Sequence, residues 1–310
     1  MAALRILGLA KSYSVGFWRK TLKPAVKPLN LAVEEGETFG FLGPNGAGKT
    51  TTLKLLMGIV FPTSGSAEIL GHHFLDPEVK RQIGFLPEQP YFYDYLSAPE
   101  LLDYYAQLSG VAQADRRKRI PALLERVGLA DVGKKQLRKF SKGMLQRVGI
   151  AQAIIHDPKI VFLDEPMSGL DPVGRREIRE LIQSLKDEGK TVFFSTHILS
   201  DAEALCDRVA VIHKGELRGI GVVEDLKSKS ADKAEVVWQG AHALEAFSGL
   251  LDEKHVTGDT VRGVISTANV DKFLEKLRQQ HGRVISLNPL HGTLEDYFLA
   301  HTSEPEKVVG

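Results

Sequence analysis

The octapeptide GPNGAGKT at residues 43–50 decides the fold of this chain. It matches the pattern G-x-x-x-x-G-K-[ST] in full, follows the apolar run TFGFL (38–42) and precedes the helix-like run TTLKLLMG. Glycine lets the backbone N–H groups of such a loop turn toward a phosphate, and the N-terminus of the following helix adds a favourable dipole. The stretch therefore predicts a nucleotide-phosphate site rather than a chance glycine-rich turn.

Each part of this loop has an expected role. Lys49 would reach the β- and γ-phosphate oxygens of ATP and serve catalysis, while the Thr50 hydroxyl would ligate Mg²⁺. The predicted ATP contacts in and after the loop are Gly43, Pro44, Asn45, Gly46, Ala47, Gly48, Lys49, Thr50 and Thr51.

The run IVFLDE at residues 160–165 is an apolar strand that ends in two carboxylates. A buried parallel strand often ends in polar residues, so the run alone is ambiguous. Combined with the phosphate loop, it is typical of a P-loop NTPase, in which Asp164 would hold Mg²⁺. Glu165 would polarise the attacking water, which favours hydrolysis over nucleotide sensing alone.

The composition is that of a globular protein of 310 residues, with 43% hydrophobic and 25% charged residues. Lys and Arg number 40 against 39 acidic residues, so no nucleic-acid partner is expected. Cys206 is the single cysteine, which excludes an internal disulfide. No apolar run approaches the ~18 residues of a membrane span, and we interpret the opening MAALRILGLA as a strand rather than a signal peptide.

The order of expected elements predicts an α/β fold. A β-rich start (1–40) precedes the loop, helices occupy 97–130, and strands at 159–165 and 191–197 flank a further helix, as expected of a mostly parallel sheet. We predict a P-loop NTPase core with a mostly parallel sheet, an N-terminal antiparallel β region, a helical subdomain and a small C-terminal α+β domain. The predicted boundaries are 1–223 for the ATP-binding domain, with its helical subdomain at about 88–157, 224–233 for a polar linker, and 234–310 for the C-terminal domain.

The chain contains three further motifs: FSKGMLQR (140–147), which precedes IVFLDE, and SGLD (168–171) and STH (195–197), which follow it. Alone, FSKGMLQR is an ordinary helix start, with Ser141 as the N-cap. The order of all five motifs resembles the ATPase subunits of ABC transporters, and the resemblance covers about residues 4–222. Within it, Ser141 and Gly143 match the signature motif, usually LSGGQ, whereas Lys142 and Met144 depart from it.

The resemblance assigns roles to residues that would otherwise pass as strand or helix ends. Asp171 matches the D-loop aspartate, His197 the switch histidine that acts in catalysis, and Tyr13 the aromatic residue that stacks on adenine. In the Q-loop region IGFLPEQPYFYDYLS (83–97), Glu88 occupies the position of the usual glutamine and Gln89 follows it. Either could supply an oxygen to Mg²⁺ or to water, and both are kept as candidate metal ligands.

The resemblance also implies partners. Two ATPase subunits, expected to be a homodimer, would meet head to tail, with the signature of each facing the γ-phosphate on the P-loop of the other. Because the chain has one P-loop and no membrane span, a separate multi-span permease is expected, with this subunit bound peripherally at the cytoplasmic face of the inner or plasma membrane. The tail HGTLEDYFLAHTSE resembles that of exporter ATPases and indicates export, but the transported substrate is not predicted.

Two alternatives and one segment stay open. A soluble ABC switch acting on ribosomes or DNA would usually carry two cassettes or a long coiled-coil insertion, and a P-loop sensor would bind ATP with little hydrolysis. The basic, aromatic stretch SVGFWRKTLKPAVKP (14–28) interrupts the β-rich start. It is either a solvated loop or a contact with the permease or lipid headgroups.

Overall fold

The computed structural model describes residues 2–16, 21–229, 233–240, 247, 249–290, 293–295 and 297–298. The chain divides into two compact units, residues 1–220 and 221–310. No helix among the described residues combines the length and the apolar character needed to cross a membrane.

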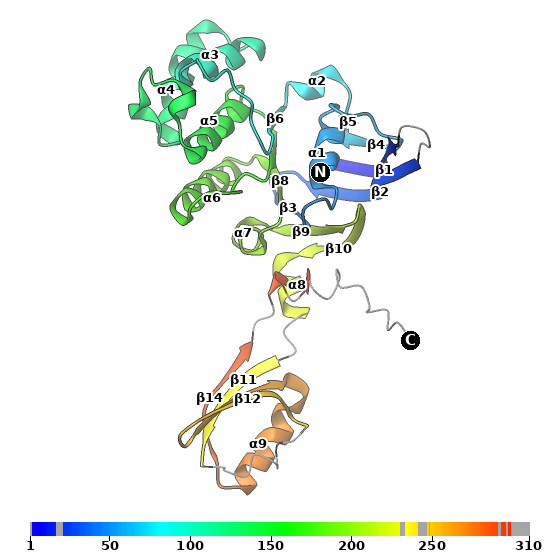
Figure 1. The fold of residues 1–310 in the computed structure, drawn as a ribbon, viewed down its shortest axis with the longest axis vertical. Helices are drawn as coiled ribbons and strands as arrows, with labels where there is room; N and C mark the ends of the chain where they lie inside the picture. The colour runs from blue at the N-terminus through cyan, green and yellow to red at the C-terminus, as the bar shows by residue number, and fades with distance from the viewer. Residues whose placement is uncertain are drawn as a thin grey trace. The chain divides into compact units, whose positions relative to one another are not determined.

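A six-stranded sheet in the order β10-β9-β3-β8-β7-β6 forms the centre of the first unit (Figure 1). The pairs β6–β7, β7–β8, β8–β3 and β3–β9 are parallel, which confirms the predicted mostly parallel α/β sheet. The strands are β3 (Thr38–Leu42), β6 (Ile83–Leu86), β7 (Ile160–Asp164), β8 (Thr191–Thr196), β9 (Arg208–His213) and β10 (Glu216–Val222).

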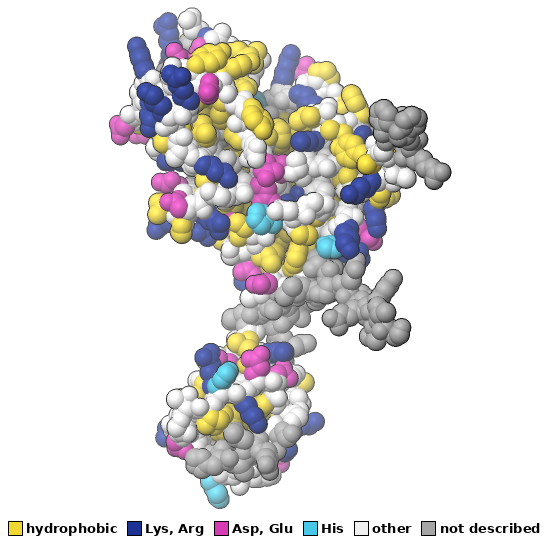
Figure 2. All heavy atoms as spheres, in the orientation of Figure 1, with side chains coloured by type: hydrophobic (Ala, Val, Ile, Leu, Met, Phe, Trp, Pro, Cys, Tyr) yellow, Lys and Arg dark blue, Asp and Glu magenta, His cyan; other side chains and the backbone are white. Residues whose placement is uncertain are grey.

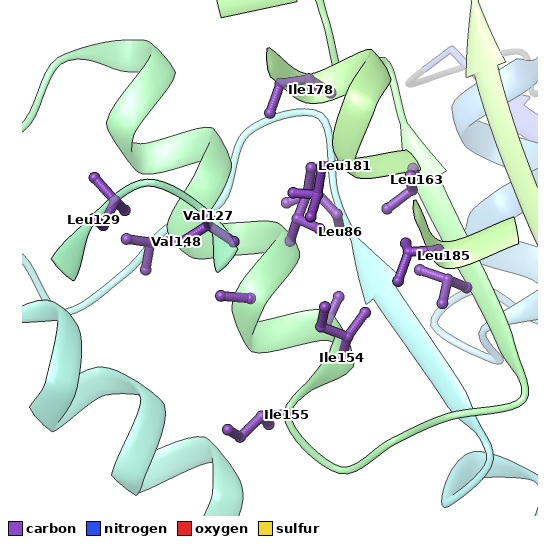
Figure 3. Close-up of a cluster of buried hydrophobic side chains, with 14 of the residues drawn as sticks. Leu86, Val127, Leu129, Val148, Ile154, Ile155, Leu163, Ile178, Leu181 and Leu185 are labelled. Carbon is purple, nitrogen blue, oxygen red and sulfur yellow. The ribbon is translucent and has the colours of Figure 1, made fainter. Parts of the chain in front are cut away.

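Hydrophobic side chains cover both faces of this sheet, because successive residues of a strand point to opposite faces. On β7, Ile160 and Phe162 pack into one core cluster, while Val161 and Leu163 pack into the other. Figure 3 shows the second cluster, in which residues of the helices meet strand residues such as Leu86 and Leu163. The helices that follow the strands are α1 (Lys49–Leu56), α5 (Lys142–Ile154), α6 (Pro172–Asp187) and α7 (Leu199–Leu205).

The helical part of the first unit groups α3, α4 and α5 on one side of the central sheet (Figure 1). Ser97 begins α3 with a capping box, since its backbone N–H donates to the Glu100 carboxylate at 2.8 Å. The remaining helical elements of this unit are α2 (Pro77–Lys80), α3 (Ala98–Leu108), α4 (Gln113–Arg126) and the short 3₁₀ turns Ala130–Val132 and Leu137–Lys139.

An antiparallel sheet in the order β2-β1-β4-β5 lies at the N-terminal side and confirms the predicted β-rich start. Its strands are β1 (Ala2–Val15), β2 (Thr21–Glu34), β4 (Ser64–Ile69) and β5 (His72–His73). The prediction that 14–28 interrupts the strands was wrong over most of its length, because Ser14 and Val15 pair with Leu22 and Thr21. Lys23 and Lys27 are exposed on β2, and such a polar, proline-containing stretch is not distinguished from a loop by its composition. Trp18 lies outside the described residues.

Charged side chains are mixed over the first unit. On the face shown in Figure 2, Lys and Arg side chains are interspersed with acidic and hydrophobic ones. This distribution agrees with the near-equal numbers of basic and acidic residues, 40 and 39.

The second unit contains a four-stranded antiparallel sheet in the order β12-β13-β11-β14. This is the strand order of the ferredoxin-like split βαβ arrangement, and it confirms the small α+β domain. Trp238, Phe247 and Phe273 are fully buried and form its aromatic core, with ring centroids 5.0–5.6 Å apart. The elements are β11 (Lys233–Gln239), β12 (Leu251–Thr257), β13 (Thr260–Ser266), a 3₁₀ turn (Thr267–Asn269), α9 (Val270–Gln279) and β14 (Arg283–Leu290).

The segment predicted as a polar linker, 224–233, differs from that expectation. The helix α8 (Val223–Lys229) occupies most of it, and both Val223 and Leu226 are buried. Two apolar residues three positions apart lie on one helical face, so they can be buried although the segment is otherwise charged.

Candidate nucleotide-binding site

The phosphate loop joins the end of β3 to the start of α1, as the sequence pattern predicts. Gly46 and Gly48 have φ angles of +79° and +111°, in the region that glycine adopts without strain. A Cβ at Gly43 would lie 2.4 Å from the backbone oxygen of Ile212, so no larger residue fits there. The loop backbone is thus shaped by glycine at three positions, and α1 begins directly after it at Lys49.

A cavity of about 290 Å³ opens over this loop. It collects most of the residues predicted to bind phosphate, together with Glu88 and Glu165 from distant parts of the chain. Its lining residues are Ala25, Asn45, Gly46, Gly48, Lys49, Thr50, Thr51, Glu88 and Glu165.

Glu165 bridges two basic groups at the edge of the cavity. Its Oε1 lies 3.0 Å from Lys49 Nζ, and its Oε2 lies 2.9 Å from His197 Nδ1. Lys49 also donates to the backbone oxygen of Gly43 at 2.7 Å. The carboxylate and the ammonium are both buried, with about 5% of each residue exposed, so solvent screens their attraction weakly. Lys49 and Oε1 form an ionic contact rather than an aligned hydrogen bond.

Asp164 is buried at the end of β7, and its Oδ1 accepts hydrogen bonds from two hydroxyl groups. Ser195 Oγ donates at 2.6 Å and Thr50 Oγ1 at 3.3 Å. Burial raises the pKa of the Asp164 carboxyl, the two hydroxyl hydrogen bonds oppose that rise, and the negative charges of Glu88 and Glu165 add to it. A buried carboxylate with acidic neighbours favours a bound cation.

The donor set here fits a divalent cation of the Mg²⁺ type. Thr50 and Asp164 offer the hydroxyl and carboxylate oxygens that hard cations prefer, and they are already adjacent. Among the described residues, no group of three or more His, Cys, Asp or Glu side chains could hold a metal by itself. Phosphate oxygens of a nucleotide and water would therefore complete the coordination, as is usual for Mg²⁺.

The two Q-loop candidates are separated by the structure. Glu88 lines the cavity, whereas the Gln89 side-chain oxygen accepts a hydrogen bond from the Tyr91 hydroxyl at 3.2 Å. Glu88 is therefore the better placed of the two.

Other predicted site residues are not among those that line the cavity. Tyr13 is 40% exposed on β1, with the Lys11 ammonium 5.1 Å from its ring centroid. Ser141 caps α5, because its Oγ accepts from the Met144 N–H at 3.2 Å, and Asp171 caps α6 in the same way through Gly174 at 2.8 Å. The predicted helix start at FSKGMLQR is therefore confirmed.

Lys142, one of the two residues that depart from the usual signature, does not extend freely from the start of α5. Its side chain lies against Gly169 of the SGLD stretch, so closely that a Cβ on Gly169 would meet it. Gly143, one residue on, also faces this stretch, with Leu170 3.8 Å from the position of a Cβ. The start of α5 and residues 168–171 are thus in contact.

Two residues near the site were not predicted. Ala25 of β2 lines the cavity, and Ser195 of β8 contacts the Asp164 carboxylate and the backbone N–H of Glu165. The stretch STH drew attention only to His197. The role of Ser195 depends on the pairing of Asp164 with Ser195 in adjacent parallel strands, which no local pattern encodes.

Comparison with known proteins places this geometry in context. Residues 26–168 match the family model described as ABC transporter. An uncharacterized ABC transporter ATP-binding protein of Synechocystis sp. is 46% identical over 298 residues, which cover 96% of this chain and 83% of that relative. The bacitracin transport ATP-binding protein BcrA of Bacillus licheniformis is 40% identical over 89% of this chain and 91% of its own length.

One solved structure bears directly on the site. It is a dimeric, post-hydrolysis state of an ATP-binding cassette bound to ADP and Pi. It superposes with a TM-score of 0.64 at 28% sequence identity, over 71% of this chain and 98% of that one.

Proposed function

Because this chain belongs to the ABC transporter ATP-binding proteins, we propose that the cavity over residues 43–51 hydrolyses ATP with Glu165 as the base. The chain is the ATP-binding, ATP-hydrolysing subunit of a transporter. The observation that carries the proposal is the bridge of Glu165 between Lys49 at 3.0 Å and His197 at 2.9 Å. This carboxylate can accept a proton from a water molecule beside the phosphate that Lys49 attracts, while His197 orients it.

Thr50 and Asp164 would hold Mg²⁺ at the same cavity, with Glu88 as a further candidate and Gln89 as a weaker one. When bound, the cation would neutralise phosphate charge and orient the γ-phosphate. The remaining glycine and polar residues of the loop, from Gly43 to Thr51, would supply backbone and side-chain donors to the phosphates.

We further propose that two copies of this chain close head to tail around two ATP molecules. Ser141, Gly143 and Asp171 stand at or near helix starts outside the lining of their own cavity, so a partner's nucleotide is the anion they would face. The similar ATP-binding cassette is dimeric in its post-hydrolysis state, which supports this arrangement. Tyr13, exposed on β1, would stack on the adenine.

We propose that the subunit drives export through a separate multi-span permease, with the ATPase at the cytoplasmic face of the membrane. The similarity to a bacitracin transport ATP-binding protein supports a role in transport, and the direction of export is inferred from the resemblance of the tail HGTLEDYFLAHTSE to that of exporter ATPases. Residues 1–223 would act as the ATP-binding domain, and residues 234–310 as an accessory domain.

The test uses the Glu165→Gln variant, in which bound ATP would persist. Light scattering coupled to size-exclusion chromatography should report a dimer with ATP and Mg²⁺ and a monomer with ADP. The double variant Glu165→Gln, Ser141→Ala should remain monomeric with ATP. An ATP complex that stays monomeric at all protein concentrations tested would exclude the head-to-tail proposal.

A further inference from the structure

We propose that Ser195 is a positioning residue that orients the Asp164 carboxylate and thereby sets the affinity of the site for its divalent cation. The inference rests on the proposed metal site and concerns a residue that makes no contact with phosphate in that proposal. It follows from three observations on the strands β7 and β8.

The first observation is that one hydroxyl serves both carboxylate residues. Ser195 Oγ donates to Asp164 Oδ1 at 2.6 Å and accepts from the Glu165 N–H at 3.0 Å. Ser195 is completely buried, so water does not compete for either hydrogen bond. A hydroxyl that both donates and accepts is fixed in direction, and so are its two partners.

The second observation is the backbone conformation of Glu165, whose φ of +49° lies in the left-handed region. A residue other than glycine is strained there and stays only where its surroundings hold it. The Glu165 N–H is shared between Ser195 Oγ at 3.0 Å and the Ser195 backbone oxygen at 3.2 Å. A substitution of Ser195 removes its hydroxyl but leaves its backbone oxygen, which continues to accept from the Glu165 N–H. Loss of the hydroxyl should therefore disturb the position of Asp164 more than that of Glu165.

The third observation concerns the free oxygen of Asp164. Within the part of the chain that the structure describes, the hydrogen bonds to this carboxylate, from Thr50 and Ser195, both fall on Oδ1. Oδ2 receives none and remains available to a cation. Thr50 would also turn toward the cation when it binds, so Ser195 is the partner that keeps the carboxylate in place.

Partners behind a metal ligand commonly change metal affinity by about 10–100-fold when removed. We therefore expect Ser195→Ala to weaken the binding of Mn²⁺, used as a paramagnetic probe for Mg²⁺, to the ADP complex by about tenfold or more. The binding is measured as the loss of the free-Mn²⁺ EPR signal during titration. The affinity for ADP in EDTA should be unchanged, because no phosphate contact is lost.

Two matched variants sharpen the test. Ser195→Thr keeps the hydroxyl and should restore the Mn²⁺ affinity. Thr191→Val removes another buried hydroxyl from the same strand, where it accepts from the Gly36 N–H at 2.9 Å at the opposite end from the site, and should leave Mn²⁺ affinity at the wild-type value. Thermal unfolding of each variant reports whether the chain is folded.

The outcomes separate this inference from the proposed function. If the wild-type ADP complex binds no Mn²⁺, the metal site itself is wrong and the inference falls with it. If the wild type binds Mn²⁺ and Ser195→Ala binds it equally well, the inference alone is overturned. An equal loss of Mn²⁺ and of metal-free ADP binding in Ser195→Ala would also overturn it, because it indicates general damage to the fold.

Discussion

At the scale of single residues, the proposed base Glu165 has little freedom to move. It is buried and strained in its backbone, and His197 lies 2.9 Å from one of its carboxylate oxygens, a contact that is kept when a phosphate takes the place of Glu165 on Lys49. A side chain confined in this way can meet a water molecule in one orientation, which is what general base catalysis requires.

We expect Glu165→Gln to lower ATP turnover by ~10²-fold or more, because an amide cannot accept the proton of the attacking water. ATP binding should be retained, since Lys49 and the loop are intact. Phosphate release and equilibrium ATP binding measure the two quantities.

The control for this prediction is Glu180→Gln. Glu180 is an exposed carboxylate paired with Arg176 on α6, and its loss should leave turnover unchanged. Turnover near wild type in Glu165→Gln would remove Glu165 from the role of base.

At the scale of elements, α5 and α3 both begin with a serine cap, yet only α5 begins within the signature motif. Replacing an N-cap serine by alanine weakens a helix by about 1 kcal/mol. The two serine-to-alanine substitutions therefore form a matched pair. Both remove a helix cap, but only the substitution in α5 is expected to affect the nucleotide.

We expect Ser141→Ala to weaken ATP-driven dimerisation and turnover more than ATP binding to the monomer. Ser97→Ala, which removes the cap of α3, should lower thermal stability to a similar extent while leaving dimerisation intact. Sedimentation velocity with ATP compares the two variants. Equal losses of monomer binding, dimerisation and turnover in Ser141→Ala would reduce Ser141 to an ordinary cap.

The elements around the phosphate loop could be predicted because glycine spacing and apolar runs are local signals. The segment 14–28 could not be, because its basic residues and prolines are as compatible with a loop as with the exposed ribbon they form. The strand β12 also carries no local signal in the sequence, since almost all of its residues are exposed and few are apolar. Ser195 became visible only when strand pairing set it beside Asp164.

At the scale of the whole molecule, the chain contains separate cores in its two units. The core of the second unit centres on Trp238, whose indole is fully buried against Phe247 and Phe273. Its N–H has no hydrogen-bond partner among the described residues. The described contacts of the ring are therefore packing contacts.

We expect Trp238→Ala to destabilise the second unit by about 3–5 kcal/mol, because truncation of a buried aromatic ring leaves a cavity. Nucleotide binding by the first unit should persist. Differential scanning calorimetry with and without ADP should show one transition lowered and the ADP-sensitive transition unchanged.

Trp238→Phe is the matched control, since it retains a ring and removes the unpartnered N–H, and it should cause a much smaller loss. If Trp238→Ala lowers the temperature of the ADP-sensitive transition as much as that of the second transition, the two units unfold together.

The contact between Lys49 and Glu165 has a consequence for how a nucleotide enters. The lysine already has an anionic partner in a buried site, so an arriving phosphate displaces a carboxylate instead of neutralising a bare cation. Binding is then an exchange of counter-ions, because the phosphate replaces the carboxylate as the partner of Lys49. In Glu165→Gln this exchange is abolished, and the affinity for ADP without metal should rise and become more sensitive to ionic strength. Calorimetric titration of both proteins with ADP at two salt concentrations would measure this difference. It would show that in the nucleotide-free enzyme Glu165 occupies the place of the phosphate on Lys49.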